Sequence, residues 1–255
     1  MTQAIRVEWQ KLRRSTVTLT TTALLLVLLP LMAFGLYSVA MEGGTGLLAH
    51  KASAFLDGEG WASYLGAVDQ IAAVAVFIGA GIVVAWTFGR EHADRTFSSL
   101  FALPVARGSI AGAKLVVLTG WVTVLSLLLV VASLGLGFVA GVGDLKEGVL
   151  LSGLVKLFAV ALSGGALSLT MGFVASIGRG YLPAVGVIIV IVAAAQISVL
   201  FGTGGWFPYA VPGLIAVSGS EGAPVLSAFQ VALVPITAAV GVWLTVHWWQ
   251  QAEVV

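Results

Sequence analysis

Six stretches of this sequence are each long and apolar enough to cross a lipid bilayer. A membrane-spanning helix needs about 20 mostly apolar residues, and the six stretches are residues 16–40, 70–88, 115–140, 157–178, 181–201 and 228–249. The first stretch contains no charged side chain and includes Pro30, which a spanning helix tolerates because neighbouring helices satisfy the freed carbonyl. The pattern predicts an all-α, polytopic membrane protein with six transmembrane helices in one domain, residues 1–255.

The composition supports this class and excludes others. Only 9% of the 255 residues are charged, whereas soluble domains carry roughly 25%, and the mean hydropathy is +1.07. The formal net charge of +1 provides no field that would attract DNA or RNA, so no nucleic-acid partner is expected. The absence of cysteine excludes disulfides, thiolate metal sites and cysteine nucleophiles.

The positions of lysine and arginine predict the orientation in the membrane. Nine of the twelve fall on one side of the six spans, namely Arg6, Lys11, Arg13, Arg14, Arg90, Arg95, Arg107, Lys114 and Arg179. Lys51 and Lys146 fall on the other side, with Lys156 at its edge. Because positively charged loops stay in the cytoplasm, both termini are expected there, in a multi-pass protein of the plasma (cytoplasmic) membrane.

Two alternatives concern the ends of these spans. Ser38-Val39-Ala40 has the small residues that signal peptidase prefers, but the preceding apolar stretch exceeds the roughly 7–15 residues of a signal peptide, so a retained first span is favoured. Lys156 is interpreted as an interfacial, snorkelling lysine, and a functional charge is the alternative. With these boundaries no charged residue lies inside a span, and Gln196 is the carboxamide near a span's middle.

Two segments on the cytoplasmic side have patterns that call for a binding surface. Residues 4–14 form an amphipathic pattern, with Ile5, Trp9 and Leu12 on one face, which is typical of a helix lying among lipid headgroups. Residues 89–113 begin with charges and continue into a short apolar run that Pro104 ends. Either a protein partner or the bilayer interface would bury the apolar side chains of that run, which are Phe97, Leu100, Phe101 and Leu103.

Two further patterns concern packing. Residues 202–227 combine aromatic residues, prolines and an apolar run too short to cross, which predicts a re-entrant or interfacial hairpin. Small residues recur every fourth position in the fourth span, at Gly164, Ser168, Gly172, Ser176 and Gly180. That spacing predicts a helix-packing seam, either within the subunit or across a dimer.

Motifs of catalysis are missing from the sequence. The nearest approach to a phosphate-binding loop, Gly112-Ala113-Lys114-Leu115, lacks the required spacing and hydroxyl. His50, His92 and His247 are too scattered to suggest a metal cluster. Catalytic, cofactor and metal sites are therefore not expected on this chain.

Two motifs carry a resemblance to a known family. They are Glu8-Trp9-x-Lys11-Leu12-x-Arg14 in the leader, and Arg90-Glu91-x-x-x-Arg95-Thr96-x-x-x-Leu100-x-x-x-Pro104-Val105-x-Arg107, closed by Lys114. Together with the order of the six spans, they resemble the permease subunits of type-2 ATP-binding-cassette exporters. The resemblance implies a type V exporter-like fold in which residues 1–15, with Ile5, Trp9, Leu12, Arg13 and Arg14, form an interfacial elbow helix.

The resemblance also implies partners. The 89–113 loop would couple to a separate ATPase through Arg90, Glu91, Asp94, Arg95, Thr96, Leu100, Pro104 and Arg107. Two permease copies, as a homodimer or related heterodimer, would work with two ATPases that bind ATP and Mg²⁺, so this chain is not itself expected to be an enzyme. The implied function is export of an amphipathic or hydrophobic substrate such as a lipid, a peptide antibiotic or a drug. The alternatives are an ion-coupled secondary carrier, and a non-transporting membrane assembly protein or intramembrane enzyme.

Overall fold

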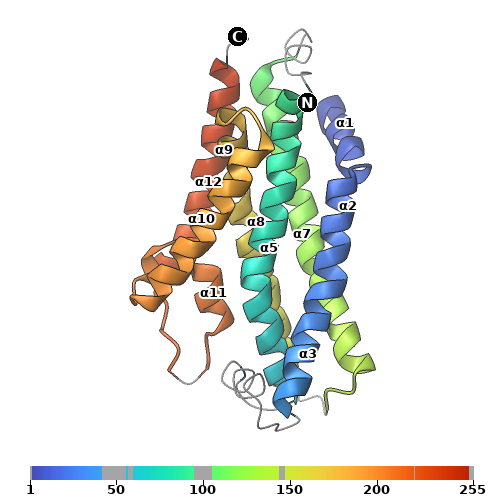
Figure 1. Cartoon of the computed structure of the whole chain (residues 1–255), viewed down its shortest axis with the longest axis vertical. Coiled ribbons are helices and arrows are strands. Elements are labelled where there is room, and N and C mark those ends of the chain that lie inside the picture. Colours follow the sequence, from blue (N-terminus) through green and yellow to red (C-terminus); the bar gives the residue numbers. More distant parts are fainter. Residues whose placement is uncertain are drawn as a thin grey trace.

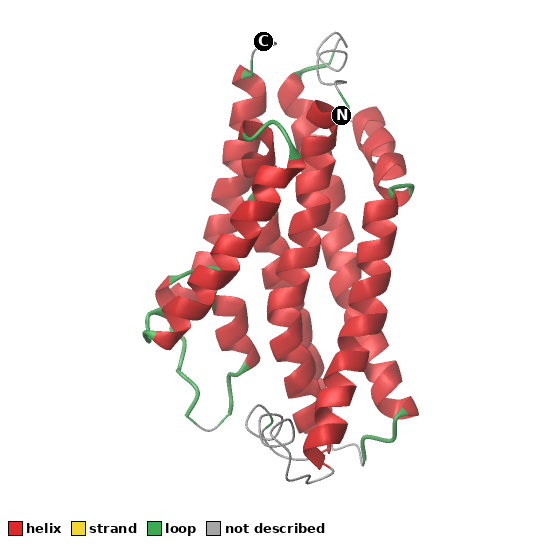
Figure 2. Cartoon of the chain, viewed as in Figure 1, coloured by secondary structure: helices red, strands yellow, loops and turns green. Residues whose placement is uncertain are grey.

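The chain folds into a bundle of long helices. The computed structural model describes residues 2–41, 56, 60–94, 105–143, 147–220 and 222–252, and no strand occurs within those ranges (Figure 2). The elements are α1 (Thr2–Arg13), α2 (Thr16–Ala23), η1 (Leu24–Leu28), α3 (Leu29–Met41), α5 (Gly60–Ala93), α7 (Arg107–Val139), α8 (Glu147–Ser168), α9 (Met171–Ile177), α10 (Tyr181–Leu200), η2 (Gly204–Trp206), α11 (Val211–Ala216) and α12 (Ala228–Gln251). Six helices in the described ranges are long and apolar enough to span a membrane, as the sequence predicts.

Helix α5 is the centre of the bundle. It packs against α3, α8, α9 and α10, and the two chain termini lie together at one end of the molecule (Figure 1). At 34 residues, α5 is about 51 Å long at 1.5 Å per residue, well beyond the roughly 30 Å of a bilayer's hydrocarbon core. Both ends of α5 therefore reach the regions where lipid gives way to water, and each end carries a buried acidic residue, Asp69 and Glu91.

The first span contains a π-helical turn that precedes a proline. Helices α2 and α3 are joined by η1, and Pro30 is the second residue of α3. Proline has no N–H and its ring crowds the carbonyl four residues earlier, so a wider turn just before it accommodates the ring without ending the helix. Pro30 is buried, while the apolar Leu24, Val27 and Leu31 are exposed on the outside of the bundle.

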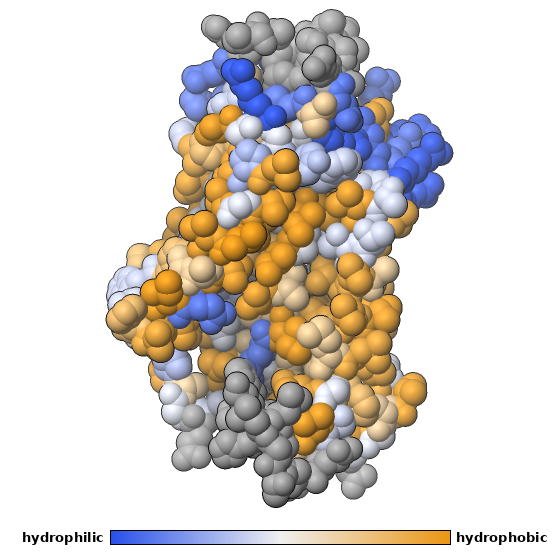
Figure 3. Space-filling model, in the orientation of Figure 1, coloured by the Kyte–Doolittle hydropathy of each residue, from blue (hydrophilic) through white to orange (hydrophobic). Residues whose placement is uncertain are grey.

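The outer surface is apolar where lipid would contact it. Figure 3 shows hydrophobic residues over the middle of the visible face and hydrophilic residues gathered at the end that carries the termini. Helix α10 has an exposed ridge formed by Leu182, Ile189 and Ile197, whose side chains are more than half exposed. Exposed apolar surface of this extent is stable in hydrocarbon and not in water, which agrees with a multi-pass membrane protein.

Three helices begin earlier in the chain than the sequence predicts. Helix α5 begins before residue 70, α7 before residue 115, and α8 before residue 157. Charged residues mark the predicted starts of these spans, but the helices continue through Asp69, Lys114 and Lys156, whose charges are paired inside the bundle. The predicted spans exclude these three charges by their boundaries, and the helices of the folded chain include them.

The segment before the last span folds as short helical turns. After α10 the chain forms η2 and then α11, which packs against α5 and α8. Val211, Pro212 and Leu214 of α11 are buried, and α11 lies beside the half of α5 that is farther from the termini (Figure 1). This short helix closes one side of the bundle at that end.

The small residues of the fourth span face other helices of the same chain. A Cβ on Gly164 would lie 3.5 Å from the Phe77 backbone nitrogen of α5, and one on Gly172 would lie 3.0 Å from the Phe88 ring. The Ser176 hydroxyl accepts a hydrogen bond from Trp249 Nε1 of α12 (2.9 Å). The sequence leaves open whether this surface packs within the subunit or across a dimer, and the described contacts are all within the subunit.

Substitution of Ser168 tests how tightly this surface is packed. The side chain is fully buried and its hydroxyl donates to the Gly165 carbonyl (2.6 Å). Ser168→Leu should lower the free energy of unfolding by about 1–3 kcal/mol, because it forces extra carbon atoms into a filled space, whereas Ser168→Ala should cost about 1 kcal/mol or less. Thermal melting of the purified variants checks this, and equal melting temperatures would contradict close packing.

Candidate functional site

The leader helix α1 buries one charged residue together with its apolar residues. Ile5 and Leu12 pack against the core, and Glu8 lies between them on the same face, with 5% of its side chain exposed. Trp9 is 45% exposed, and Arg13 and Arg14 are exposed. The apolar face of α1 is thus directed at α7 of the same chain, and Trp9 stays available to the surroundings.

Four charged side chains from three helices meet beneath α1, and we call them the ionic cluster: Glu8, Lys11, Glu91 and Lys114. Lys114 Nζ lies 3.0 Å from Glu8 Oε2 and 2.7 Å from Glu91 Oε1. Lys11 Nζ lies 2.6 Å from Glu8 Oε1 and 3.3 Å from the same Glu91 oxygen. Two positive and two negative groups therefore form a neutral network that ties α1, α5 and α7 together.

Lys114 is the centre of the ionic cluster. Its side chain is fully buried, and its ammonium also donates to the Thr87 carbonyl (3.3 Å) and lies 5.9 Å from the centre of the Phe88 ring. A buried ammonium is stable only when it is paired and hydrogen-bonded, and here three oxygen atoms and an aromatic face surround it. Lys11 is 32% exposed and closes the cluster on the solvent side.

The cluster holds Glu8 in its ionised form. Burial alone would raise the pKa of Glu8, but the positive charges of Lys114 and Lys11 outweigh burial and hold that pKa below its usual value. The stabilisation from Glu8 is therefore present above the pKa of the unfolded chain and is lost as the pH falls through the lower, folded value.

The ionic cluster includes residues from both helices that flank the segment predicted to couple to an ATPase, α5 before it and α7 after it. Glu91 is in the last turn of α5 and Lys114 is in the second turn of α7, and the intervening residues 95–104 include the apolar run. Arg95, Thr96, Leu100 and Pro104 lie outside the described residues. Any force applied to this segment would therefore reach helices that are locked to each other and to α1.

The predicted contact residues in the described part of the segment have different environments. Glu91 is 4% exposed inside the ionic cluster, so its expected role as a surface charge that meets a partner does not fit its position. Arg107 begins α7 and donates a hydrogen bond to the Ala252 carbonyl at the end of α12. Arg90 is half-buried, and Asp94 is exposed just after α5 ends.

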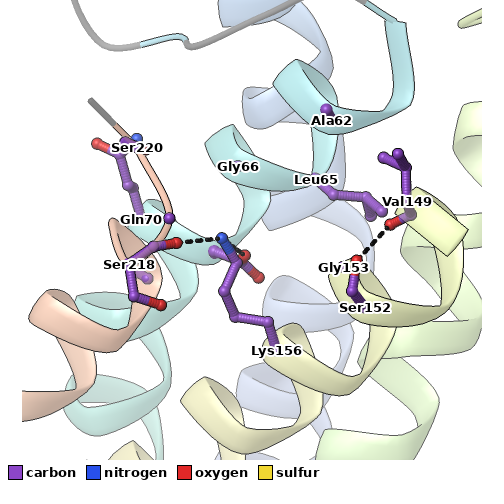
Figure 4. A pocket seen from close by; sticks show the side chains of 13 residues that line it. Ala62, Leu65, Gly66, Gln70, Val149, Ser152, Gly153, Lys156, Ser218 and Ser220 are labelled. Atoms are coloured by element: carbon purple, nitrogen blue, oxygen red, sulfur yellow. Dashed lines mark hydrogen bonds and ion pairs between the residues drawn. The ribbon is translucent and has the colours of Figure 1, made fainter. Parts of the chain in front are cut away.

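A second charged pair lies at the opposite end of α5. Lys156 Nζ of α8 is 3.5 Å from Asp69 Oδ2 and donates to the Ser218 carbonyl at 3.3 Å, just beyond α11. Figure 4 shows Lys156 pointing across a cavity toward Ser218. Lys156, interpreted from the sequence as a snorkelling residue, is 27% exposed, and its ammonium is directed at a carboxylate of a neighbouring helix.

Sequence patterns contained a signal for one of these sites. Glu8 shares the helical face of Ile5 and Leu12, and a charge on an otherwise apolar face indicates a buried partner. The residues around Glu8 do not indicate which residue is its partner, because Lys114 is 106 positions away in the sequence. The Asp69–Lys156 pair lacked any such signal, since both residues stand at the edges of the apolar stretches.

Comparisons with known proteins agree with this architecture. Residues 4–195 match the model of a family described as "ABC-2 family transporter protein". Over 142 residues the chain is 30% identical to the bacitracin transport permease protein BCRB of Bacillus licheniformis, and the match covers 53% of this chain and 65% of that relative, less than two thirds of its length. The family match includes most of α1, the ionic cluster, four of the six candidate spans and most of the fifth. The chain therefore belongs to the ABC-2 family of transporter proteins.

Proposed function

We propose that this chain is the permease subunit of an ATP-driven exporter, powered by a separate ATPase that docks on the 95–104 segment. Family membership supports the permease role. The observation that carries the coupling step is the ionic cluster, which joins both helices that flank the segment to the leader helix. Movement of a docked ATPase would then shift α1, α5 and α7 as one unit.

The remaining partners follow from the same proposal. Two copies of the chain, identical or related, work with two ATPase subunits, and ATP and Mg²⁺ bind on those subunits. The termini and the docking segment face the cytoplasm, which agrees with the excess of lysine and arginine on that side of the six spans. The cell location is the plasma membrane.

The substrate is an amphipathic molecule. One support is the relative named for bacitracin transport, which makes a peptide antibiotic one candidate within this class. A second support is a polar cavity that adjoins an apolar one between α5, α8, α10 and α11, so that both kinds of surface are available side by side.

An ion-coupled carrier is the second candidate, because Asp69 supplies a buried carboxylate within a spanning helix. Its pairing with Lys156 reduces its ability to take up a cation. Export that stops when the ion gradient is collapsed at constant ATP would favour this candidate over the ATP-driven one.

Copurification from native membranes tests the proposed function. A tagged chain should bring with it a cassette ATPase, identified by its phosphate-binding loop, and the complex should hydrolyse ATP. Leu100→Ala should weaken this association by about 2 kcal/mol, roughly thirtyfold, because truncation of an apolar anchor at such a contact has an effect of that size.

Ser98→Ala is the matched control in the same segment, and it should leave copurification within about twofold of wild type. Membrane insertion of each variant is measured alongside. A wild-type chain that brings no ATPase would contradict the proposed function, and normal copurification with Leu100→Ala would contradict the docking segment alone.

A further inference from the structure

Two cavities adjoin each other at the end of the bundle that lies away from the termini. The more polar of the two, which we call the polar cavity, has a volume of about 380 Å³ and is lined by Asp69, Gln70 and Lys156, by apolar residues of α5 and α8, and by the chain just after α11. The apolar cavity, of about 330 Å³, is lined by α5, α10 and α11. Gln70 and the α11 region line both, so one molecule with two chemically different parts could occupy the pair.

Lys156 is the charge that the polar cavity presents. Its side chain is 27% exposed, whereas the Asp69 side chain beneath it is fully buried. The two contacts of its ammonium, 3.5 Å to Asp69 and 3.3 Å to the Ser218 carbonyl, are longer than the usual 2.7–2.9 Å of charge-assisted hydrogen bonds. An ammonium has three donors, so it can take a stronger acceptor from the cavity.

The other polar groups make an anion the better match. The Ser152 and Ser218 hydroxyls donate to the Gly148 and Ile215 carbonyls, so the Lys156 ammonium is the reachable charged donor that the structure shows. A cation in the cavity would meet the exposed ammonium first, because neither oxygen of Asp69 is accessible to solvent. The reachable charge is positive and the negative one is hidden.

The apolar cavity is suited to a hydrocarbon chain. Its walls include Phe77, Ile191, Val199, Tyr209, Leu214 and Val217. Pockets of this kind gain affinity from apolar walls and orientation from a few polar groups, and here the orienting group is in the adjoining polar cavity.

We propose that the two cavities form one binding site for an amphiphile with an anionic head group, phosphate or carboxylate, which Lys156 binds while the apolar tail lies between α5, α10 and α11. Asp69 opposes the bound anion and so limits its affinity, which allows release. The inference deepens the proposed function by naming the substrate class, and it rests on that function for the transport step.

Photolabelling tests the site. The full-length chain, in nanodiscs of phosphatidylcholine, is exposed to dodecyl phosphate that carries a photoreactive diazirine in its tail. Labelling should be saturable, should map to α10 and α11, and should be displaced by unlabelled dodecyl phosphate. Dodecyltrimethylammonium should not displace it, and inorganic phosphate should do so at least a hundredfold less well, which separates an amphiphile from a free anion.

Variants that change the charge of Lys156 or Asp69 test whether the site binds an anion or a cation. Lys156→Gln should lower the affinity at least tenfold, Lys156→Arg should keep it within about threefold, and Asp69→Asn should raise it several-fold. Because Lys156→Gln leaves Asp69 buried without its partner, the double variant Asp69→Asn with Lys156→Gln is the folded control, and it should also fail to bind.

Three outcomes would overturn the inference: labelling that is not saturable, unchanged affinity in the folded double variant, or equal competition by inorganic phosphate. A loss of affinity with Asp69→Asn together with a gain for Lys156→Gln would show a cationic ligand instead. The test needs no ATPase, so labelling as expected without a copurifying ATPase would leave the site standing and refute the proposed function. Copurification of an ATPase without labelling would leave the proposed function standing and refute the binding site.

Discussion

Lys114→Met should destabilise the protein by about 3–5 kcal/mol, the range for removal of one partner from a buried ion pair. The substitution leaves Glu8 and Glu91, both about 5% exposed, without the ammonium that lies within 3.0 Å of each. Two buried carboxylates would then repel each other, and the partly exposed Lys11 would offset only part of that repulsion. Loss of the folded fraction in detergent, followed by tryptophan fluorescence on heating, measures the effect.

Lys11→Met is the matched control, because Lys11 contacts the same two carboxylates but is 32% exposed. Its removal should cost about 1 kcal/mol or less, since water screens a partly exposed pair. Glu8→Gln and Glu91→Gln, added to Lys114→Met, should recover much of the lost stability by removing the carboxylate charges that Lys114 neutralises. Equal losses for Lys114→Met and Lys11→Met would show that the buried pairs do not hold the three helices together.

Gly89→Ala should have an effect of comparable size through packing alone. A Cβ at this position of α5 would lie 2.4 Å from the Tyr181 backbone nitrogen and 2.6 Å from the Gly180 carbonyl carbon. Backbone atoms cannot turn aside as a flexible side chain can, so α5 would have to move away from the turn that joins α9 to α10. Overpacking of this kind typically costs 1–3 kcal/mol and occasionally more, and we expect about 3 kcal/mol here.

Gly66→Ala, in the same helix, is the control for Gly89→Ala. No atom lies within 4 Å of a Cβ built there, and alanine is favoured over glycine in a helix interior by about 1 kcal/mol. The same substitution should therefore stabilise the protein at one position and destabilise it at the other. Thermal melting of both variants decides this, and similar shifts would contradict the close approach of α5 to the α9–α10 turn.

The helical class of the chain was predictable from its apolar stretches, and the limits of those helices were not. An isolated charge is costly in lipid, so a charge beside an apolar stretch predicts the limit of a span. In the folded chain Asp69, Lys114 and Lys156 lie within helices, because partners from other helices offset that cost. Pairing of this kind depends on tertiary structure, and a single sequence contains no direct record of it.

The candidate site was predictable in its location but not in its geometry. The two motifs contain all four residues of the ionic cluster, so the sequence pointed to the correct regions of the chain. Glu91 was nevertheless predicted to face a partner, because its place in a polar loop says nothing of Lys114 on the following helix. The spacing of Gly164, Ser168 and Gly172 predicts close packing, but it does not say which helices these residues contact; the structure shows that Gly164 and Gly172 contact α5.

The ionic cluster also sets an order of events during synthesis. Lys114 follows Glu8 by 106 positions, so it is made later. At the usual rate of about 5–20 residues per second, Glu8 waits roughly 5–20 seconds for its buried partner, and two spans are made in that interval. Until Lys114 is made, Glu8 lacks the buried ammonium that pairs with it in the folded chain, and the ionic cluster is incomplete.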